Sequence, residues 1–126
     1  ANNLTIRIFL DLNVGMSRTG ILPENALQLF VFCKSLKGLN PVGLHAYDGH
    51  HRDADLEVRT KGCDAGFERV LNLKQTIAAQ TGIDATIVTS GNTTISIHSK
   101  RKNIEVSPGT FIFWDYGYHK QFAEQP

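Results

Sequence analysis

The fold is decided by the stretch LTIRIFLDLNVGMSRTGILPENALQLFVFCKSLKG, residues 4–38. Apolar and polar side chains alternate from Leu4 to Leu12, which is the period of a β-strand. After a turn, Pro23 suits the first position of a helix, and apolar residues then recur at helical spacing until Gly38. A strand that leads through a turn into a helix is the opening of a parallel βα unit.

The next part of the chain repeats this order. The short apolar segment 41–47 predicts a second strand, and a polar loop follows it. Apolar residues between 67 and 78 share one helical face, which predicts a second helix that Gly82 stops. Residues 55–60 are expected to form a separate short turn before that helix.

Two further segments complete the pattern. Residues 85–90 predict a third strand, and residues 104–115 predict a fourth extended region that Pro108 and Gly109 interrupt. The alternation of strands and helices indicates an α/β fold, in which helices cover a parallel sheet. A complete (β/α)8 barrel needs about 250 residues, so four strands make about half of one. The chain is therefore either a small open sheet or part of a larger barrel.

Composition excludes several classes of protein. The chain has 126 residues, of which 41% are hydrophobic and 20% are charged, and this is typical of one globular domain. A net charge of +1 argues against a nucleic-acid or membrane partner, and the basic run at 99–102 is interpreted as a solvated turn. The sequence shows neither a membrane span nor a signal peptide, and Cys33 and Cys63 form no disulfide or zinc pattern. A cytoplasmic location is expected.

Ligands of parallel α/β sheets bind beyond the carboxyl ends of the strands, and polar clusters follow every predicted strand. After the first strand, Gly15 and Gly20 bracket Arg18 in a tight exit that directs its guanidinium over the end of the sheet. An ordinary ion pair between Arg18 and a surface carboxylate is the alternative, and the spacing alone leaves both interpretations open.

The second cluster is GLHAYDGHH, residues 43–51. His45 and Tyr47 are two positions apart, so on a strand they face the same side, where imidazole and phenol can stack on a planar heteroaromatic ring. A half-buried structural histidine is the alternative for His45. Metal ligation is a second possibility, although the spacing matches no strong zinc signature; the residues concerned are Asp48, His50, His51 and Asp53.

The third and fourth clusters are TSGNTTIS at 89–96 and SPGT at 107–110. Small residues after a strand let backbone N–H groups approach a phosphate, and hydroxyl groups add further donors. The candidate phosphate contacts are Ser90, Gly91, Thr93, Gly109 and Thr110. The same residue types also form simple turns, and either loop taken alone does not distinguish the two roles.

Together these motifs resemble the fold type III pyridoxal-phosphate (PLP) enzymes of the alanine racemase-like superfamily, and most closely their D-threonine aldolase and D-serine dehydratase branch. The resemblance covers nearly the whole chain and implies the C-terminal part of a PLP-binding (β/α)8, or TIM-type, barrel. It implies that Arg18 donates to the phenolic oxygen of the cofactor and that His45 and Tyr47 lie beside its pyridine ring. The loops with Ser90, Gly91, Thr93, Gly109 and Thr110 would then hold its phosphate.

The chain also departs from the family pattern. Ser107 stands where alanine racemases carry the arginine that holds the pyridine nitrogen, which favours an aldolase or dehydratase over a racemase. Asn92 replaces a second glycine and is the residue that we expect to keep a positive φ there. No lysine is placed to form the Schiff base, which the family forms at the first strand of the barrel. Residues 1–126 are therefore expected to be an internal fragment without the N-terminal strands and the C-terminal β domain.

The resulting expectation is part of a PLP-dependent lyase for a D-amino acid, inactive as this fragment alone. A divalent metal would bind the parent through residues outside this chain. The exposed edges Leu4–Leu12 and Thr110–Trp114 predict a homo-oligomer or association with the missing half of the barrel, and Tyr116 and Tyr118 are candidate contacts to phosphate or a neighbouring subunit. Two alternatives stay open: a non-catalytic module that carries PLP or another phosphate ligand, and a metal-dependent hydrolase that uses His50, His51 and Asp53.

Overall fold

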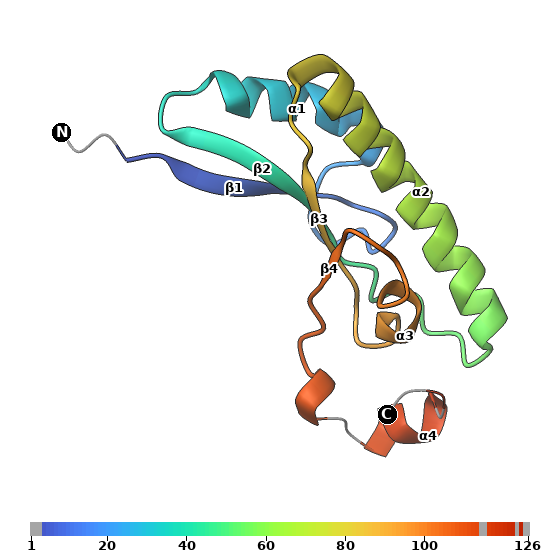
Figure 1. Cartoon of the computed structure of the whole chain (residues 1–126). Helices are drawn as coiled ribbons and strands as arrows, with labels where there is room; N and C mark the ends of the chain where they lie inside the picture. Colours follow the sequence, from blue (N-terminus) through green and yellow to red (C-terminus); the bar gives the residue numbers. More distant parts are fainter. Residues whose placement is uncertain (1–3, 114–115, 123, 125–126) are drawn as a thin grey trace.

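The computed structural model describes residues 4–113, 116–122 and 124. Its centre is one four-stranded parallel sheet in the order β1-β2-β3-β4 (Figure 1). The strands are β1 (Ile6–Asp11), β2 (Leu39–Ala46), β3 (Thr86–Thr89) and β4 (Glu105–Val106). The parallel order confirms the predicted α/β class, and the first three strands lie within the predicted segments or extend two residues beyond them.

Two long helices cover one face of this sheet. They are α1 (Pro23–Ser35) and α2 (Leu56–Thr81), and Figure 1 shows them beside each other. Three short helical segments follow later in the chain: α3 (Ile95–His98), the 3₁₀ turn η1 (Phe111–Phe113) and α4 (Tyr116–Gln121). The core lies between the sheet and the long helices, where Leu10, Leu44 and Ile87 from the strands meet Phe30 and Ile77 from the helices.

The opposite face of the sheet carries the alternate residues of β1 and β2. Phe9 pairs with Gly43, and Asp11 pairs with His45. A Cβ on Gly43 would lie 2.2 Å from the ring of Phe9, so this glycine leaves the space that the phenyl ring occupies. Phe9 is nevertheless 41% exposed, which shows that this face is only partly covered by the described chain.

The start of α2 differs from the prediction. Residues 56–60 form its first turn rather than a separate turn, and the Asp55 carboxylate caps it by accepting from the N–H groups of Glu57 (2.8 Å) and Val58 (3.2 Å). The prediction was wrong because the buried residues of these first turns are Arg59 and Cys63, which carry no aliphatic periodicity. The predicted stop is confirmed, since Gly82 has φ 72 and its N–H donates to the Ala78 carbonyl over 2.9 Å.

The fourth extended region is much shorter than predicted. Only Glu105–Val106 pairs with β3, because the chain leaves the sheet before Pro108. Residues 111–113 form η1, so the segment Thr110–Trp114 is not the last edge strand of the sheet; Trp114 itself lies outside the described residues. The edges are therefore β1 and the short β4.

Arg59 connects the end of the chain to α2. Its side chain is fully buried and donates to the Asp53 carbonyl and the Glu124 carboxylate. The guanidinium also lies over the ring of Phe122, 4.7 Å from its centroid. A buried cation is tolerated only with such partners, so residues 122 and 124 complete the packing at the start of α2.

No helix in the described parts of the chain is both long and apolar enough to span a bilayer.

Candidate functional site

The carboxyl ends of the four parallel strands lead into four polar loops at one edge of the sheet. These loops are residues 12–22, 47–55, 90–94 and 107–110. The structure thus confirms that the predicted clusters lie at the same edge, where ligands of parallel sheets bind.

The first and second loops bring Arg18 and Tyr47 together. The Cζ atom of Arg18 lies 5.1 Å from the centroid of the Tyr47 ring, within the range of a cation–π contact. The Asn13 side chain shapes the exit by accepting from the N–H groups of Gly15 and Ser17, each over 3.0 Å. The exit therefore holds the guanidinium over an aromatic face, and its charge also acts on the Asp11 carboxylate, so the two interpretations that the sequence left open are not exclusive.

His45 faces a carboxylate that the sequence analysis missed. Its Nδ1 lies 2.8 Å from Oδ1 of Asp11, and both side chains are about 40% exposed. Burial alone would raise the pKa of Asp11, but hydrogen bonds from His45 and Thr19 and the charge of Arg18 lower it. The sequence feature that could have indicated this pair is the position of Asp11 at the end of β1, where it is in register with His45 of β2.

The loop after β3 contains Ser90, Gly91 and Thr93, whose polar groups form hydrogen bonds with other groups of the protein rather than pointing to solvent. The hydroxyl of Ser90 donates to the Gly91 carbonyl, and that of Thr93 donates to the His51 carbonyl, both over 2.7 Å. The Gly91 N–H donates to the carboxylate of Asp48 over 2.8 Å. The positive φ of this loop is at Ser90 (φ 108) and not at Asn92, so that expectation was wrong.

The loop after β4 lies against the loop after β3. Thr110 donates its backbone N–H to Oδ1 of Asn92 over 3.2 Å, and the Asn92 amide donates to the Thr110 hydroxyl. A Cβ on Gly109 would have no neighbour within 4 Å, so this glycine faces open space. The two predicted phosphate loops therefore form one continuous surface.

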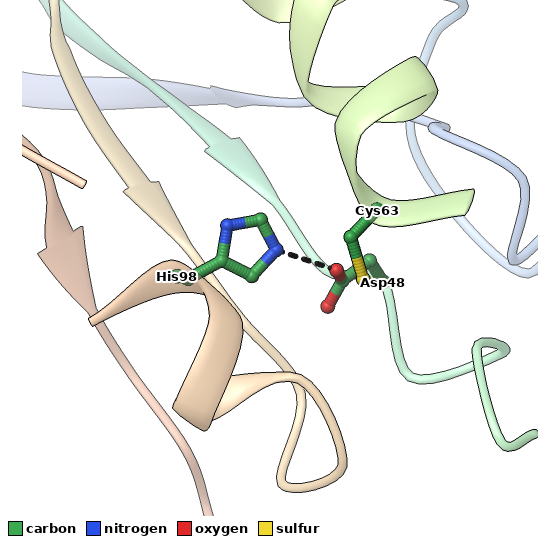
Figure 2. Close-up of side chains that lie close together, drawn as sticks. All are labelled: Asp48, Cys63 and His98. Atoms are coloured by element: carbon green, nitrogen blue, oxygen red, sulfur yellow. Dashed lines mark hydrogen bonds and ion pairs between the residues drawn. The ribbon is translucent and has the colours of Figure 1, made fainter. Parts of the chain in front are cut away.

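A buried cluster lies behind these loops. Figure 2 shows His98 pointing at Asp48, with Cys63 of α2 beside the carboxylate. Oδ1 of Asp48 accepts from the Thr94 hydroxyl (2.6 Å) as well as from Gly91, and Oδ2 faces Nε2 of His98 at 2.7 Å. The three side chains border a cavity of about 10 Å³, roughly the room that one water needs.

Donor atoms of Asp48, Cys63 and His98 lie within 4.8 Å of one another, a spacing that also suits a metal ion. Burial would raise the pKa of Asp48, but the hydrogen bonds from His98, Thr94 and Gly91 lower it. Burial and the neighbouring Asp48 raise the pKa of the Cys63 thiol far above its ordinary value, so it stays protonated. The cluster is thus a satisfied hydrogen-bond network.

This cluster shares only Asp48 with the metal ligands that the sequence suggested. The rings of His50 and His51 lie 4.0 Å apart, and burial together with His50 lowers the pKa of His51. Among the described residues, the compact group of metal-type donors does not include His50, His51 or Asp53.

Arg101 departs from the solvated turn predicted for 99–102, whose lysines are exposed as expected. Its Nε–H donates to Nδ1 of His98 (3.1 Å), and Nη2 donates to Asp64 (2.5 Å). The guanidinium lies 4.3 Å from the centroid of the Phe67 ring. Arg101 therefore links the buried cluster to α2.

The remaining candidates lie on helices and turns. Tyr118 accepts a hydrogen bond from Arg52 over 3.4 Å, and Tyr116 is 77% exposed. The lysines lie on α1, α2, α4 and the turns at residues 37 and 100–102, as predicted.

The chain resembles known proteins over almost its full length. The family model "Alanine racemase, N-terminal domain" matches residues 1–117. The structure is similar to a D-threonine aldolase from Filomicrobium marinum, with a TM-score of 0.80 and 20% identity over 97% of this chain and 33% of that one. It is also similar to alanine racemases from Clostridium difficile 630 (TM-score 0.70, 16% identity, 97% and 31% covered) and Corynebacterium glutamicum (0.63, 15%, 91% and 31%).

No curated protein sequence matches the chain. The chain spans about a third of the length of the solved structures it matches, and at this identity the likeness establishes the fold alone. The parallel βα units are part of a (β/α)8 barrel of the alanine racemase type. With 117 of its 126 residues matched by the family model, the chain belongs to the alanine racemase N-terminal domain family.

Proposed function

We propose that this chain supplies ring and phosphate contacts in a PLP-dependent lyase that acts on a D-amino acid, of the D-threonine aldolase or D-serine dehydratase kind. Members of the family bind PLP. The observation that carries the proposal is the contact of Arg18 with the Tyr47 ring, at the sheet edge where the two small-residue loops join.

The donor set of this edge fits PLP in its chemistry. Arg18 offers a forked cation to an anionic oxygen, and Tyr47 offers an aromatic face to a planar ring. A Cβ on Gly91 would lie 2.9 Å from the Gly49 Cα, so a larger residue would force the Ser90–Thr94 loop away from the loop that follows β2. The small residues of this loop let a phosphate approach its backbone, but the Gly91 N–H and the hydroxyls of Ser90 and Thr93 already bond within the protein, so other groups of the two joined loops would hold the phosphate.

When bound, PLP supplies an electron sink that weakens the bonds at Cα of an amino acid. The residues of this chain would orient it: Arg18 would stabilise negative charge at the phenolic oxygen, and Tyr47 would pack against the ring. Asp11 faces Nδ1 of His45, which keeps a proton on that nitrogen and leaves Nε2 to accept one from a substrate group. These residues therefore provide orientation and one site of proton transfer.

Ser107 favours lyase over racemase chemistry within this proposal. It leaves β4 with its N–H bonded to the Thr89 carbonyl over 3.1 Å, and its short hydroxyl side chain is exposed. A serine cannot supply the charged, forked donor that alanine racemases place at this position, so the pyridine nitrogen would be held differently.

The test uses the full-length protein that contains residues 1–126. We expect borohydride reduction with PLP to label one lysine outside this chain, and the unreduced protein to cleave or dehydrate D-threonine or D-serine. Binding of PLP without label or turnover would instead support a non-catalytic carrier. A label on a lysine within residues 1–126 would contradict the proposed division of the site.

A further inference from the structure

Asp48 connects the two parts of the proposed cofactor site. It directly follows Tyr47 at the end of β2, and its side chain is only 6% exposed. Three groups of the segment after β3 form hydrogen bonds with its carboxylate: the Gly91 N–H, the Thr94 hydroxyl and the His98 ring. One buried carboxylate therefore joins the aromatic residue to the loop that is suited to a phosphate.

The geometry favours a hydrogen-bond hub over a metal site. Oδ1 accepts from two donors at 2.6 and 2.8 Å, and Oδ2 faces Nε2 of His98 at 2.7 Å. A metal ion would have to replace these donors and also remove the proton of Cys63, whose pKa burial raises. Each carboxylate oxygen already has the short partners that a buried charge requires.

The partners of His98 fix the direction of its hydrogen bond to Asp48. Because Arg101 donates to Nδ1, this nitrogen carries no proton, and Nε2–H must donate to Oδ2. Arg101 is itself held by Asp64 of α2. The carboxylate is thus anchored from the helix side and cannot turn away without breaking this chain of contacts.

This anchoring determines the shape of the loop. Gly91 and Thr94 bind the same oxygen of Asp48, and Ser90 beside them has the positive φ of 108 that non-glycine residues adopt only under constraint. The Gly91 N–H, which faces inward, is therefore structural. Contacts to a phosphate would come from other groups of the loop.

We propose that Asp48 is a positioning residue that holds the Ser90–Thr94 loop in its phosphate-receiving shape, without touching the cofactor itself. This inference rests on the proposed function and names the residue that sets phosphate recognition in it. It predicts that loss of the carboxylate weakens recognition of the phosphate group specifically, while the contacts of Arg18 and Tyr47 with the ring are kept.

The experiment measures the Kd of PLP and of pyridoxal, which lacks the phosphate, for the full-length protein. In Asp48→Asn, the amide nitrogen opposes either Nε2–H of His98 or the donors at Oδ1, so the hub is broken. We expect the preference for PLP over pyridoxal to fall about tenfold, equal to about 1.4 kcal/mol, with pyridoxal affinity changed less than about twofold. Asp53→Asn, which changes an exposed carboxylate of the neighbouring loop, should keep the wild-type preference.

If Asp48→Asn fails to fold, Thr94→Val and Thr94→Ser decide the matter: valine should lower the preference and serine should restore it. An unchanged preference in the folded variants, or equal losses for both ligands, overturns the inference. A wild-type protein that does not prefer PLP to pyridoxal defeats the proposed function, and the inference fails with it.

Discussion

Arg18 provides the most direct test at the scale of single residues. In the full-length protein, Arg18→Ala should remove a charge-assisted hydrogen bond to PLP, on the order of 1.5 to 3 kcal/mol. The Kd of PLP should therefore rise, the absorption of the bound cofactor should shift, and activity should fall. Arg18→Lys keeps the charge but loses the forked donors, so we expect only partial recovery. Unchanged spectra and kinetics would leave Arg18 as a surface cation on Tyr47.

Asp48 should also make stability depend on acid. Its pKa is lowered in the folded protein, so its contribution to stability is present above the ordinary value of 3.8 and is lost as the pH falls through the folded-state value. Denaturant unfolding at pH 7 and at pH 3 should show a smaller acid-induced loss for Asp48→Asn than for the wild type. Asp53→Asn serves as the control, and its loss of stability between pH 7 and pH 3 should equal that of the wild type. An equal acid-induced loss of stability in all three proteins would contradict this prediction.

The sequence predicted some residues of the site but not those whose partners are distant. Arg18 and Tyr47 could be placed because each lies in the loop that follows a recognisable strand, and parallel strands bring their ends together. The role of Asp48 depends on Thr94 and His98, 46 and 50 positions further along the chain. Only the packed loop shows that these donors converge on one carboxylate.

At the scale of elements, the cap of α2 has a measurable consequence. Asp55→Ala leaves the N–H groups of Glu57 and Val58 without their acceptor, so the free energy of unfolding should fall by about 1 kcal/mol. Asp55→Asn keeps a capping oxygen and should cost much less. Chemical denaturation followed by circular dichroism compares the two variants, and equal stability of alanine and asparagine variants would show that the cap is unimportant.

Helix α2 also shows why the ends of a helix were harder to predict than its presence. Its second half has regular apolar spacing that includes Phe67, Val70 and Ile77, and this half was predicted from the sequence. Its first half buries Arg59 and Cys63 instead, against partners from the end of the chain and from the β2 exit. Tertiary contacts therefore extend this helix beyond what local periodicity indicates.

At the scale of the whole molecule, the uncovered face and edges of the sheet predict association. β1 is an edge strand, and Ile6 and Phe9 are 62% and 41% exposed. Since unpaired strand edges and apolar surface seek partners, the isolated 126-residue chain should sediment as a dimer or larger species. Ile6→Lys should reduce this association. Cooperative unfolding of a monomer at micromolar concentration would mean that the segment is a self-sufficient domain.

The contacts of Arg59 show where a stable version of this segment has to end. The family match stops at residue 117, but the carboxylate and the ring that enclose the guanidinium belong to Glu124 and Phe122. A protease that removes α4 and the residues after it would also remove these partners, and the guanidinium would lose its carboxylate and the ring that covers it while keeping its bond to the Asp53 carbonyl. The first turns of α2 would then become the next segment open to digestion. The last residue that the family model matches is therefore not the last residue that the segment needs to resist cleavage.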